Sequence, residues 1–471
     1  MMIRPALILA CLLASALPGC RAPDTPADSR AADVDQQVRA RWGKPLADLP
    51  VRTLVAISAN NENIQNEFAW AFSLHHALAY GQRVNIEWRD VGGGGGQIGR
   101  YIENEYKRHD SAGIDILWGG GDQAFRQLAK AALLEPLLLG DDLLNDNVIP
   151  ARFGGIELLD AKRLWVGSAV SGFGFLYNAE LLERFHIAPP AIWDDLADPR
   201  FADLLVLTDP TQSSSAAAAY RMIAQTGRDW PHGWAKLLRI LANAKRFTNN
   251  AGSAANAPLV GESLASACID FYGLLRVAES NGKLVYVSPP GQTVFTPDPI
   301  AILKNPPDRE LASRFVDFVL SRPGQAMLAL RVGAPDGPVR SPLARQPIRK
   351  DVYKDYARDL LPRLVDPYLA GQAMALTPDK DAVNYNVLRL LVRTATVDNL
   401  TGLRAARDRL IATHDEPARL AEFLALPPEA DTLATMAAAA KTLSDPKSAD
   451  DLTVRWQTFF AEKYRKVARA D

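Results

Sequence analysis

The residues with the clearest chemical potential form a hydroxyl-rich segment near the middle of the chain. Residues 208–215 read Thr-Asp-Pro-Thr-Gln-Ser-Ser-Ser, between an apolar run that predicts a strand and an alanine run that predicts a helix. Backbone N–H groups lack partners in the first turn of a helix and the helix dipole is positive there, so this position favours an oxyanion. A capping cluster without a ligand role is the alternative, although capping needs only one such residue. The predicted ligand contacts are Thr211, Ser213, Ser214 and Ser215.

A second candidate is the run of five glycines at residues 92–96, which Gln97 follows. The run lies between a predicted strand and a predicted helix and contains G-x-G-x-x-G, the pattern of a dinucleotide-binding turn. Five consecutive glycines match many patterns by chance, and no Walker A lysine follows them. We therefore expect a turn whose exposed N–H groups hold an anionic or polar ligand, with Gly93, Gly94 and Gln97 as contacts. A purely structural loop is the alternative.

Signatures of the common enzymes and metal sites are missing from the sequence. The six histidines include no H-E-x-x-H pair, and Ser171 lacks the flanking glycines of a nucleophile elbow. The three cysteines cannot form a disulfide framework in so long a chain, and Cys268 lies in an apolar run typical of inert core. We expect no catalytic residues, no bound metal and no cofactor.

The composition limits the kinds of binding partner that can be expected. The 471 residues are 48% hydrophobic and 23% charged, which is typical of a globular chain of two or three domains. The 53 Lys and Arg residues balance 54 Asp and Glu residues, so no overall charge favours binding to nucleic acid or to a membrane surface. We expect a monomer that binds a small molecule and no nucleic acid.

The N-terminus has the features of an export signal. Arg4 precedes a short apolar run, and Leu17-Pro18-Gly19-Cys20 follows it. This tetrapeptide resembles the lipobox of bacterial lipoproteins, which implies removal of residues 1–19 and acylation of Cys20 as a membrane anchor facing the periplasm or the cell exterior. Ordinary cleavage that leaves Cys20 as a free thiol is the alternative. No later stretch reaches the roughly 20 apolar residues of a transmembrane helix.

The remaining chain divides by pattern. Residues 20–48 are rich in Ala, Pro, Asp and Arg and predict a flexible tether. From residue 51 to residue 303, strand-like runs alternate with helical stretches, which predicts an α/β fold with a mostly parallel sheet. Beyond residue 347 only helical patterns remain, so residues 347–471 predict a C-terminal helical extension.

Several segments together resemble the extracellular solute-binding proteins of bacterial ABC importers, in the type 2 group that includes iron(III)-, organophosphate- and hexose-phosphate-binding proteins. The resembling segments are residues 58–63, 173–178, 193–201, 208–215, 297–301 and 315–325. The resemblance implies the two-lobe type 2 periplasmic-binding-protein fold, with two crossing strands and the ligand between the lobes. Lobe 1 would comprise residues 49–165 and 297–346, and lobe 2 residues 166–296; the family pattern does not account for the extension.

The resemblance also implies a role, which is solute capture by lobe closure and delivery to the membrane permease. Contacts are expected at the carboxyl ends of strands. The further candidates are Asn60, Asn61, Glu62, Gly120, Asp122, Ser171, Phe173, Asp270 and Tyr272. Donors from both lobes favour an anion and the carboxylates suit hydroxyl groups, which together indicate a phosphorylated or carboxylated polyol.

Three alternatives remain beside this role. Iron(III) binding in the family typically uses two adjacent tyrosines, whereas here Phe271 precedes the single Tyr272. A ligand sensor for a membrane signalling kinase would have the same sequence features. A hydrolase or transferase on a related frame is disfavoured because no nucleophile–base pair is recognisable.

Overall fold

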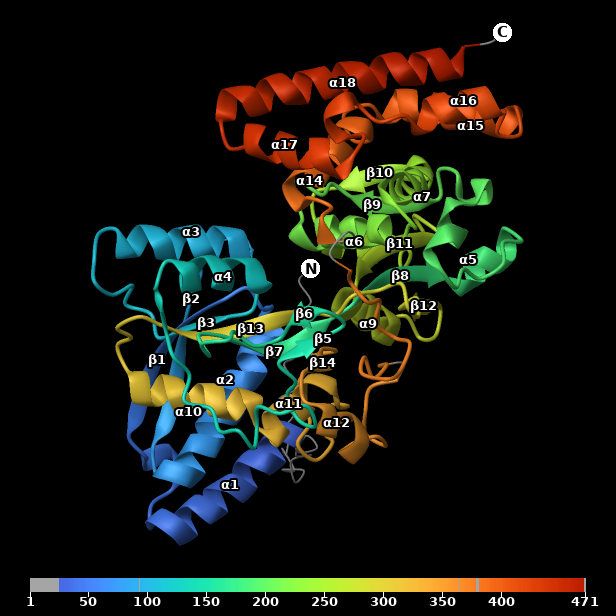
Figure 1. The fold of residues 1–471 in the computed structure, drawn as a ribbon. Helices are drawn as coiled ribbons and strands as arrows, with labels where there is room; N and C mark the ends of the chain where they lie inside the picture. The colour runs from blue at the N-terminus through green and yellow to red at the C-terminus, as the bar shows by residue number, and fades with distance from the viewer. Residues whose placement is uncertain (1–24, 93, 363, 378–380, 470–471) are drawn as a thin grey trace, which may run out of the picture.

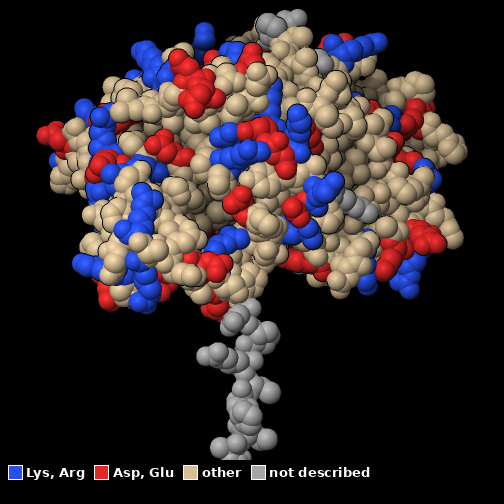
Figure 2. Space-filling model, turned by 90° about the horizontal axis from the view of Figure 1, so that it is seen from below, with Lys and Arg blue, Asp and Glu red and all other residues tan. Residues whose placement is uncertain are grey.

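The computed structural model describes residues 25–92, 94–362, 364–377 and 381–469. The expected export signal and Cys20 lie outside these residues. In the described part of the chain, no helix combines the length and apolar character needed to cross a bilayer. On the face shown in Figure 2, basic and acidic side chains are interspersed over the surface, as the near-neutral net charge leads one to expect.

The first lobe is built on a seven-stranded sheet with the order β14-β7-β13-β3-β1-β2, in which β4 also pairs with β13. The parallel core of this sheet is β1 between β2 and β3, and β13 runs antiparallel to β3 and β7. Its strands are β1 (Val51–Ser58), β2 (Arg83–Arg89), β3 (Ile116–Trp118), β4 (Leu134–Glu135), β7 (Val166–Ser171), β13 (Thr296–Leu303) and β14 (Gln346–Pro347). Its helices are α2 (Glu62–Tyr80), α3 (Gly95–Tyr106), α4 (Asp122–Lys130), α10 (Arg309–Leu320), α11 (Arg322–Ala329) and α12 (Lys350–Asp355).

The second lobe is built on a five-stranded sheet with the order β10-β9-β11-β8-β12. Its strands are β8 (Phe173–Asn178), β9 (Leu205–Thr208), β10 (Ala244–Thr248), β11 (Ala265–Ile269) and β12 (Leu284–Val287). Its helices are α5 (Ala179–Arg184), α6 (Ser214–Gln225), α7 (Trp230–Ala242), α8 (Ala251–Asn256) and α9 (Asp270–Glu279). A small hairpin of β5 (Arg152–Phe153) and β6 (Ile156–Glu157) stands apart from both sheets.

The chain passes from one sheet to the other at Gly172, later than expected. Strand β7 was predicted to belong to lobe 2, but it pairs with β13 and β14 in the first sheet. Gly172 separates β7 from β8, and a Cβ there would lie 2.6 Å from the ring of Phe295, so the crossing requires a residue without a side chain. Residues 288–295 make the return crossing between β12 and β13.

The predicted tether is a packed helix over most of its length. Helix α1 (Pro26–Trp42) has a capping box between Thr25 and Asp28 and ends at Gly43. Its buried residues Val34 and Val38 pack beneath α2, and Figure 1 shows α1 alongside that helix. The prediction of a flexible segment is therefore wrong for residues 26–42. Average composition suggested disorder, while two valines four residues apart and good caps were enough to fix a helix on an existing core.

The prediction of a helical extension over residues 347–471 starts too early, because α12 packs on α11 of lobe 1 and the stacked helices of the extension begin at residue 385. The extension comprises α14 (Tyr385–Ala395), α15 (Leu400–Ala412), α16 (Pro417–Leu424), α17 (Leu433–Thr442) and α18 (Pro446–Ala468). Figure 1 shows these helices stacked on lobe 2 beside α7 and β10. Leu391 of α14 and Trp456 and Phe460 of α18 share one continuous core with Trp234 of α7. The extension is thus part of lobe 2, where burial of these large side chains stabilises both regions together.

Candidate functional site

A cleft of about 1630 Å³ lies between the two lobes. Helices α3 and α4 line it on the lobe 1 side, and α6 and the N-terminal part of α14 line it on the lobe 2 side. Residues of β7 and β13, the strands that lead into the crossings, complete the wall. The cleft therefore lies where movement of one lobe relative to the other would change its width.

Most of the residues predicted from the sequence line this cleft. They are Asn60, Asn61, Gly94, Gln97, Gly120, Asp122, Ser171, Phe173, Thr211, Ser213, Ser214, Ser215 and Tyr272. Glu62, the exposed first residue of α2, does not line it. Asp270 does not line it either, and Gly93 lies outside the described residues.

Two helix N-termini from lobe 1 face the cleft without side-chain caps. Helix α3 begins after Gly94 and α4 begins after Gly121, and neither cap residue has a side chain to accept the first-turn N–H groups. The two turns are in close contact, since a Cβ on Gly95 would lie 2.2 Å from the carbonyl oxygen of Gly120. The glycines are thus required by backbone packing. The first-turn N–H groups of α3 and α4, which no N-cap side chain accepts, favour an anion.

Asp298, the third residue of β13, fixes one of these turns. Its Oδ1 atom accepts the N–H groups of Gly120 at 2.7 Å and Gly121 at 3.0 Å, and its Oδ2 atom pairs with Arg345. The Arg345 side chain is only 5% exposed, and its guanidinium lies over the ring of Phe271 from lobe 2 at 4.6 Å. Arg345 also lines the cleft. Sequence analysis missed this pair because the two residues are 47 positions apart and carry no motif.

The hydroxyl segment of lobe 2 has divided roles. Ser213 is the N-cap of α6, with its Oγ atom accepting the N–H of Ala216 at 3.3 Å. The hydroxyl of Thr211 donates to Asp209 at 2.7 Å and accepts from Arg393 at 2.8 Å. Both hydroxyls are therefore used within the protein. The capping interpretation accounts for Ser213, whereas the Ser214 hydroxyl makes no hydrogen bond to a described side chain or backbone group.

Helix α14 of the C-terminal extension contributes three residues to the cleft that the sequence did not predict. Tyr385, Asn386 and Arg389 of α14 line the lobe 2 wall. Arg389 donates from Nε to the carbonyl oxygen of Pro210 at 2.8 Å and from Nη2 to that of Thr211 at 2.7 Å. The spacing Tyr385, Arg389, Arg393 placed these side chains on one helix face, but only the fold shows which face meets the cleft.

Two polar atoms at the cleft lack partners. Ser171 is 4% exposed and its Oγ atom makes no hydrogen bond within the described part of the protein. The Nδ2 atom of Asn60 is buried in the same unpartnered state. Leaving such groups unpaired costs roughly 1–3 kcal/mol each, and a bound polar solute would remove that cost.

Asp270 lies behind the cleft wall. Its carboxylate accepts the N–H of Gly172 at 2.7 Å and an N–H of the Gln346 side chain at 2.5 Å. It thereby joins α9 of lobe 2 to the crossing and to β14 of lobe 1. Burial raises its pKa to about 6, although these hydrogen bonds and Arg345 oppose the shift. The expectation that Asp270 contacts a ligand in the cleft is not met, because backbone donors and Gln346 occupy its oxygens.

Hard metal ligands do not gather in the cleft. Across the described residues, no group of three or more His, Cys, Asp or Glu side chains is placed to hold a metal ion. Tyr272 lines the cleft, and Phe271 stacks on it with ring centroids 4.2 Å apart. A phenyl ring thus stands beside Tyr272 where a second phenolate oxygen would be needed.

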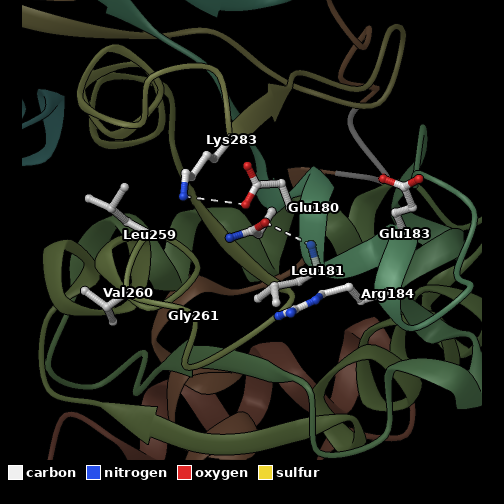
Figure 3. A pocket seen from close by; sticks show the side chains of 9 residues that line it. Glu180, Leu181, Glu183, Arg184, Leu259, Val260, Gly261 and Lys283 are labelled. Atoms are coloured by element: carbon white, nitrogen blue, oxygen red, sulfur yellow. Dashed lines mark hydrogen bonds and ion pairs between the residues drawn. The ribbon is translucent and has the colours of Figure 1, made fainter.

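A smaller pocket of about 500 Å³ lies on the outside of lobe 2 (Figure 3). Its charges are partly paired, with Lys283 3.5 Å from Glu180, and the Asn178 side chain caps α5 at the N–H of Leu181. Asn178 and Phe173 are the two ends of β8, and Phe173 lines the cleft. The pocket is therefore about 17 Å along the strand from the cleft and separate from it.

Comparison with known proteins shows which family has this architecture. The family model of bacterial extracellular solute-binding proteins matches residues 114–358, slightly more than half of the chain. The phosphoglycerate transport regulatory protein PgtC of Salmonella typhimurium is 31% identical over 164 residues, which are 35% of this chain and 40% of that protein. The match thus spans less than half the length of this curated relative.

Solved structures show the same fold. Iron-bound HitA from Pseudomonas aeruginosa has a TM-score of 0.52 at 20% identity, covering 73% of this chain and 99% of that one. The periplasmic binding protein P5PA has a TM-score of 0.52 at 19% identity, covering 76% and 98%. At these identities the likeness concerns the fold alone, and it confirms the two-lobe periplasmic-binding-protein architecture with an added C-terminal helical region.

Proposed function

The chain belongs to the bacterial extracellular solute-binding protein family, and we propose that it is the substrate-binding component of an ABC importer for a small anionic solute. The solute would bind in the cleft between the lobes and be handed to a membrane permease. In this proposal the solute is bound and not converted, since the cleft offers hydrogen-bond donors and cations and no nucleophile–base pair was recognisable in the sequence.

The proposal of an anionic solute rests on the charge of the residues that line the cleft. Five Lys or Arg residues and three Asp or Glu residues line it. Two of the cations are matched by carboxylates, Arg345 by Asp298 and Arg221 by Asp381. Three form no ion pair with a described carboxylate, and they come from both lobes: Arg100 of α3, Lys130 of α4 and Arg389 of α14.

Cations without carboxylate partners on both walls of the cleft also explain how an anionic solute would close the two lobes. Cations that face each other across water repel, and an anion between them reverses the sign of that interaction. The contacts that one anion makes to both lobes exist only when the lobes are close, so the solute binds the closed form more tightly and shifts the population toward it. The permease would recognise that form.

A phosphorylated carboxylate is the solute class we favour. The name of the matched Salmonella relative refers to phosphoglycerate, which carries two anionic groups and a hydroxyl. Two anionic groups suit the helix N-termini of lobe 1 that lack a capping side chain and, on lobe 2, Arg389, which has no carboxylate partner among the described residues. The unpartnered atoms of Ser171 and Asn60 suit the hydroxyl.

We further propose that the protein is exported and anchored by acylated Cys20. Residue 25 begins the described chain immediately before α1, which packs on lobe 1. Anchoring at Cys20 would hold lobe 1 close to the membrane.

Isothermal titration calorimetry of the purified mature chain tests the solute class. We expect 3-phosphoglycerate to bind more tightly than glycerate, glycerol, spermidine or ferric citrate. Tighter binding of ferric iron would favour the iron alternative, and tighter binding of an uncharged polyol would overturn the anionic class. Co-purification with a membrane kinase in place of an ABC permease would favour the sensor alternative.

A further inference from the structure

Helix α14 forms part of the cleft although it lies outside the matched family region. That region ends at residue 358, and α14 begins at Tyr385. The side of α14 that carries Val387, Leu388 and Leu391 is buried in the lobe 2 core. The helix is therefore fixed to lobe 2 and cannot move independently of it.

The opposite side of α14 holds the hydroxyl segment in place. Tyr385 donates from its hydroxyl to the carbonyl oxygen of Ser214 at 3.1 Å. Arg389 takes the carbonyl oxygens of Pro210 and Thr211. Arg393 pairs with Asp209 at 2.9 Å. Three side chains spaced four residues apart thus hold the backbone that precedes α6, so the extension determines where the free N–H groups of that helix start.

Arg389 differs from Arg393 in how many of its N–H donors are already hydrogen-bonded within the protein. A guanidinium has five N–H donors, and the two carbonyl oxygens use two of them. The other three are not taken by any described residue, and no described carboxylate pairs with the charge. Arg393, by contrast, pairs with both Asp209 and Asp398. Arg389 lines the cleft and Arg393 does not.

We propose that Arg389 contacts an anionic group of the solute directly and sets the cleft's preference for anions, while Arg393 is a positioning residue that acts through Asp209 and Thr211. This assignment rests on the proposed anionic solute. It makes the C-terminal extension part of the binding site, so that a chain shortened before α14 would lose the lobe 2 contact to the anion. The rigid core side of α14 keeps the guanidinium in a preorganised position.

Calorimetry with 3-phosphoglycerate and glycerate on the full mature chain tests the assignment. Arg389→Met removes the charge and the N–H donors and keeps an unbranched side chain. We expect its affinity for 3-phosphoglycerate to fall about 10- to 100-fold, as for loss of a hydrogen bond to a charged group. We also expect added salt to weaken binding less in this variant than in the wild type, because one charge no longer contributes.

Arg455→Met is the matched control. Arg455 is an exposed arginine of α18 in the same extension, paired with Glu429 and outside the cleft. It should keep wild-type affinity and salt dependence. Arg393→Met should weaken binding while leaving the salt dependence closer to that of the wild type, because its charge is already matched by Asp209.

The outcomes separate this inference from the proposed function. Wild-type binding of 3-phosphoglycerate with unchanged affinity in Arg389→Met overturns the role of Arg389 and leaves the proposed function standing. If the wild type binds no anion, both fail. If Arg389→Met melts well below Arg455→Met without solute, its affinity does not test the assignment and the affinity of Arg389→Lys is measured in its place. Lysine keeps the charge but cannot bind two carbonyl oxygens and an anion with one planar guanidinium. Wild-type affinity in Arg389→Lys would then overturn the assignment.

Discussion

Arg345 and Asp298 form a buried ion pair at the wall of the cleft, and the same carboxylate fixes the turn that starts α4. Their side chains are 5% and 13% exposed, so neither charge is screened well by water. The pair connects three parts of the site, because Asp298 lies in β13, Arg345 precedes β14 and the guanidinium lies over the ring of Phe271 of lobe 2. Loss of either charge should therefore affect stability and binding together.

Asp298→Asn tests the energetic side of this pair. Asparagine keeps the shape and an acceptor for the glycine N–H groups but leaves Arg345 buried without a counter-charge. We expect the free energy of unfolding to fall by about 3–5 kcal/mol, measured by urea denaturation. Asp141→Asn breaks a pair with Arg163 in which the Asp141 side chain is 88% exposed, so it should change stability little. Equal effects of the two substitutions would contradict the structural role of Asp298.

The buried carboxyl of Asp270 predicts a pH dependence of stability. Its pKa is raised from 3.8 to about 6 in the folded protein, so between these values the folded chain binds more protons than the unfolded chain. Stability from this group is therefore present below about pH 4 and is lost as the pH rises through about 6. Asp270→Asn removes the titration, so the stability of the wild type relative to this variant should decrease from pH 4 to pH 7. A constant or increasing difference over that range would show that burial does not control this carboxyl.

The sequence could predict the α/β class, the alternation of elements and a set of site residues most of which line the cleft, because glycine turns, hydroxyl clusters and strand ends are local patterns. It could not predict Arg345 or Arg389, whose roles arise from contacts 47 and 179 residues apart along the chain. Helix α1 was missed for a related reason, since its stability comes from packing of two valines on a distant core. Asp270 had a suitable type and position, but only the fold shows that its oxygens are already occupied.

Anchoring through Cys20 is tested by fractionation. Cys20→Ala removes the thiol that would be acylated, so the protein should move from the membrane fraction to the soluble fraction. Immunoblotting of the two fractions after a high-salt wash gives the measurement. Retention of the variant on washed membranes would rule out the lipid anchor at this residue.

Ser213 and Ser214 should respond differently to removal of their hydroxyls. Ser213→Ala removes the N-cap of α6 and should lower the free energy of unfolding by about 1 kcal/mol in the absence of solute. Ser214→Ala should leave that stability unchanged and lower the affinity for 3-phosphoglycerate about tenfold, as expected for one hydrogen bond to a charged acceptor. Thermal melts and calorimetry separate the two effects. Unchanged affinity in a stable Ser214→Ala variant would remove this hydroxyl from the site.

Ser171 offers the sharpest separation of binding from folding, because its buried hydroxyl has no partner among the described residues. Ser171→Ala removes an unsatisfied polar atom, so the melting temperature without solute should stay equal or rise. Affinity for 3-phosphoglycerate should nevertheless fall about tenfold if the hydroxyl binds the solute.

Ser168 on the same strand is the matched control for Ser171. Its Oγ atom accepts from the Trp118 indole at 2.8 Å and donates to the carbonyl oxygen of Asp298 at 2.7 Å. Both bonds are buried, and Ser168 does not line the cleft. Ser168→Ala should therefore lower stability by leaving two buried groups unpaired, whereas Ser171→Ala should not. A loss of stability in Ser171→Ala comparable to that in Ser168→Ala would mean that its hydroxyl has a structural partner and is not reserved for a solute.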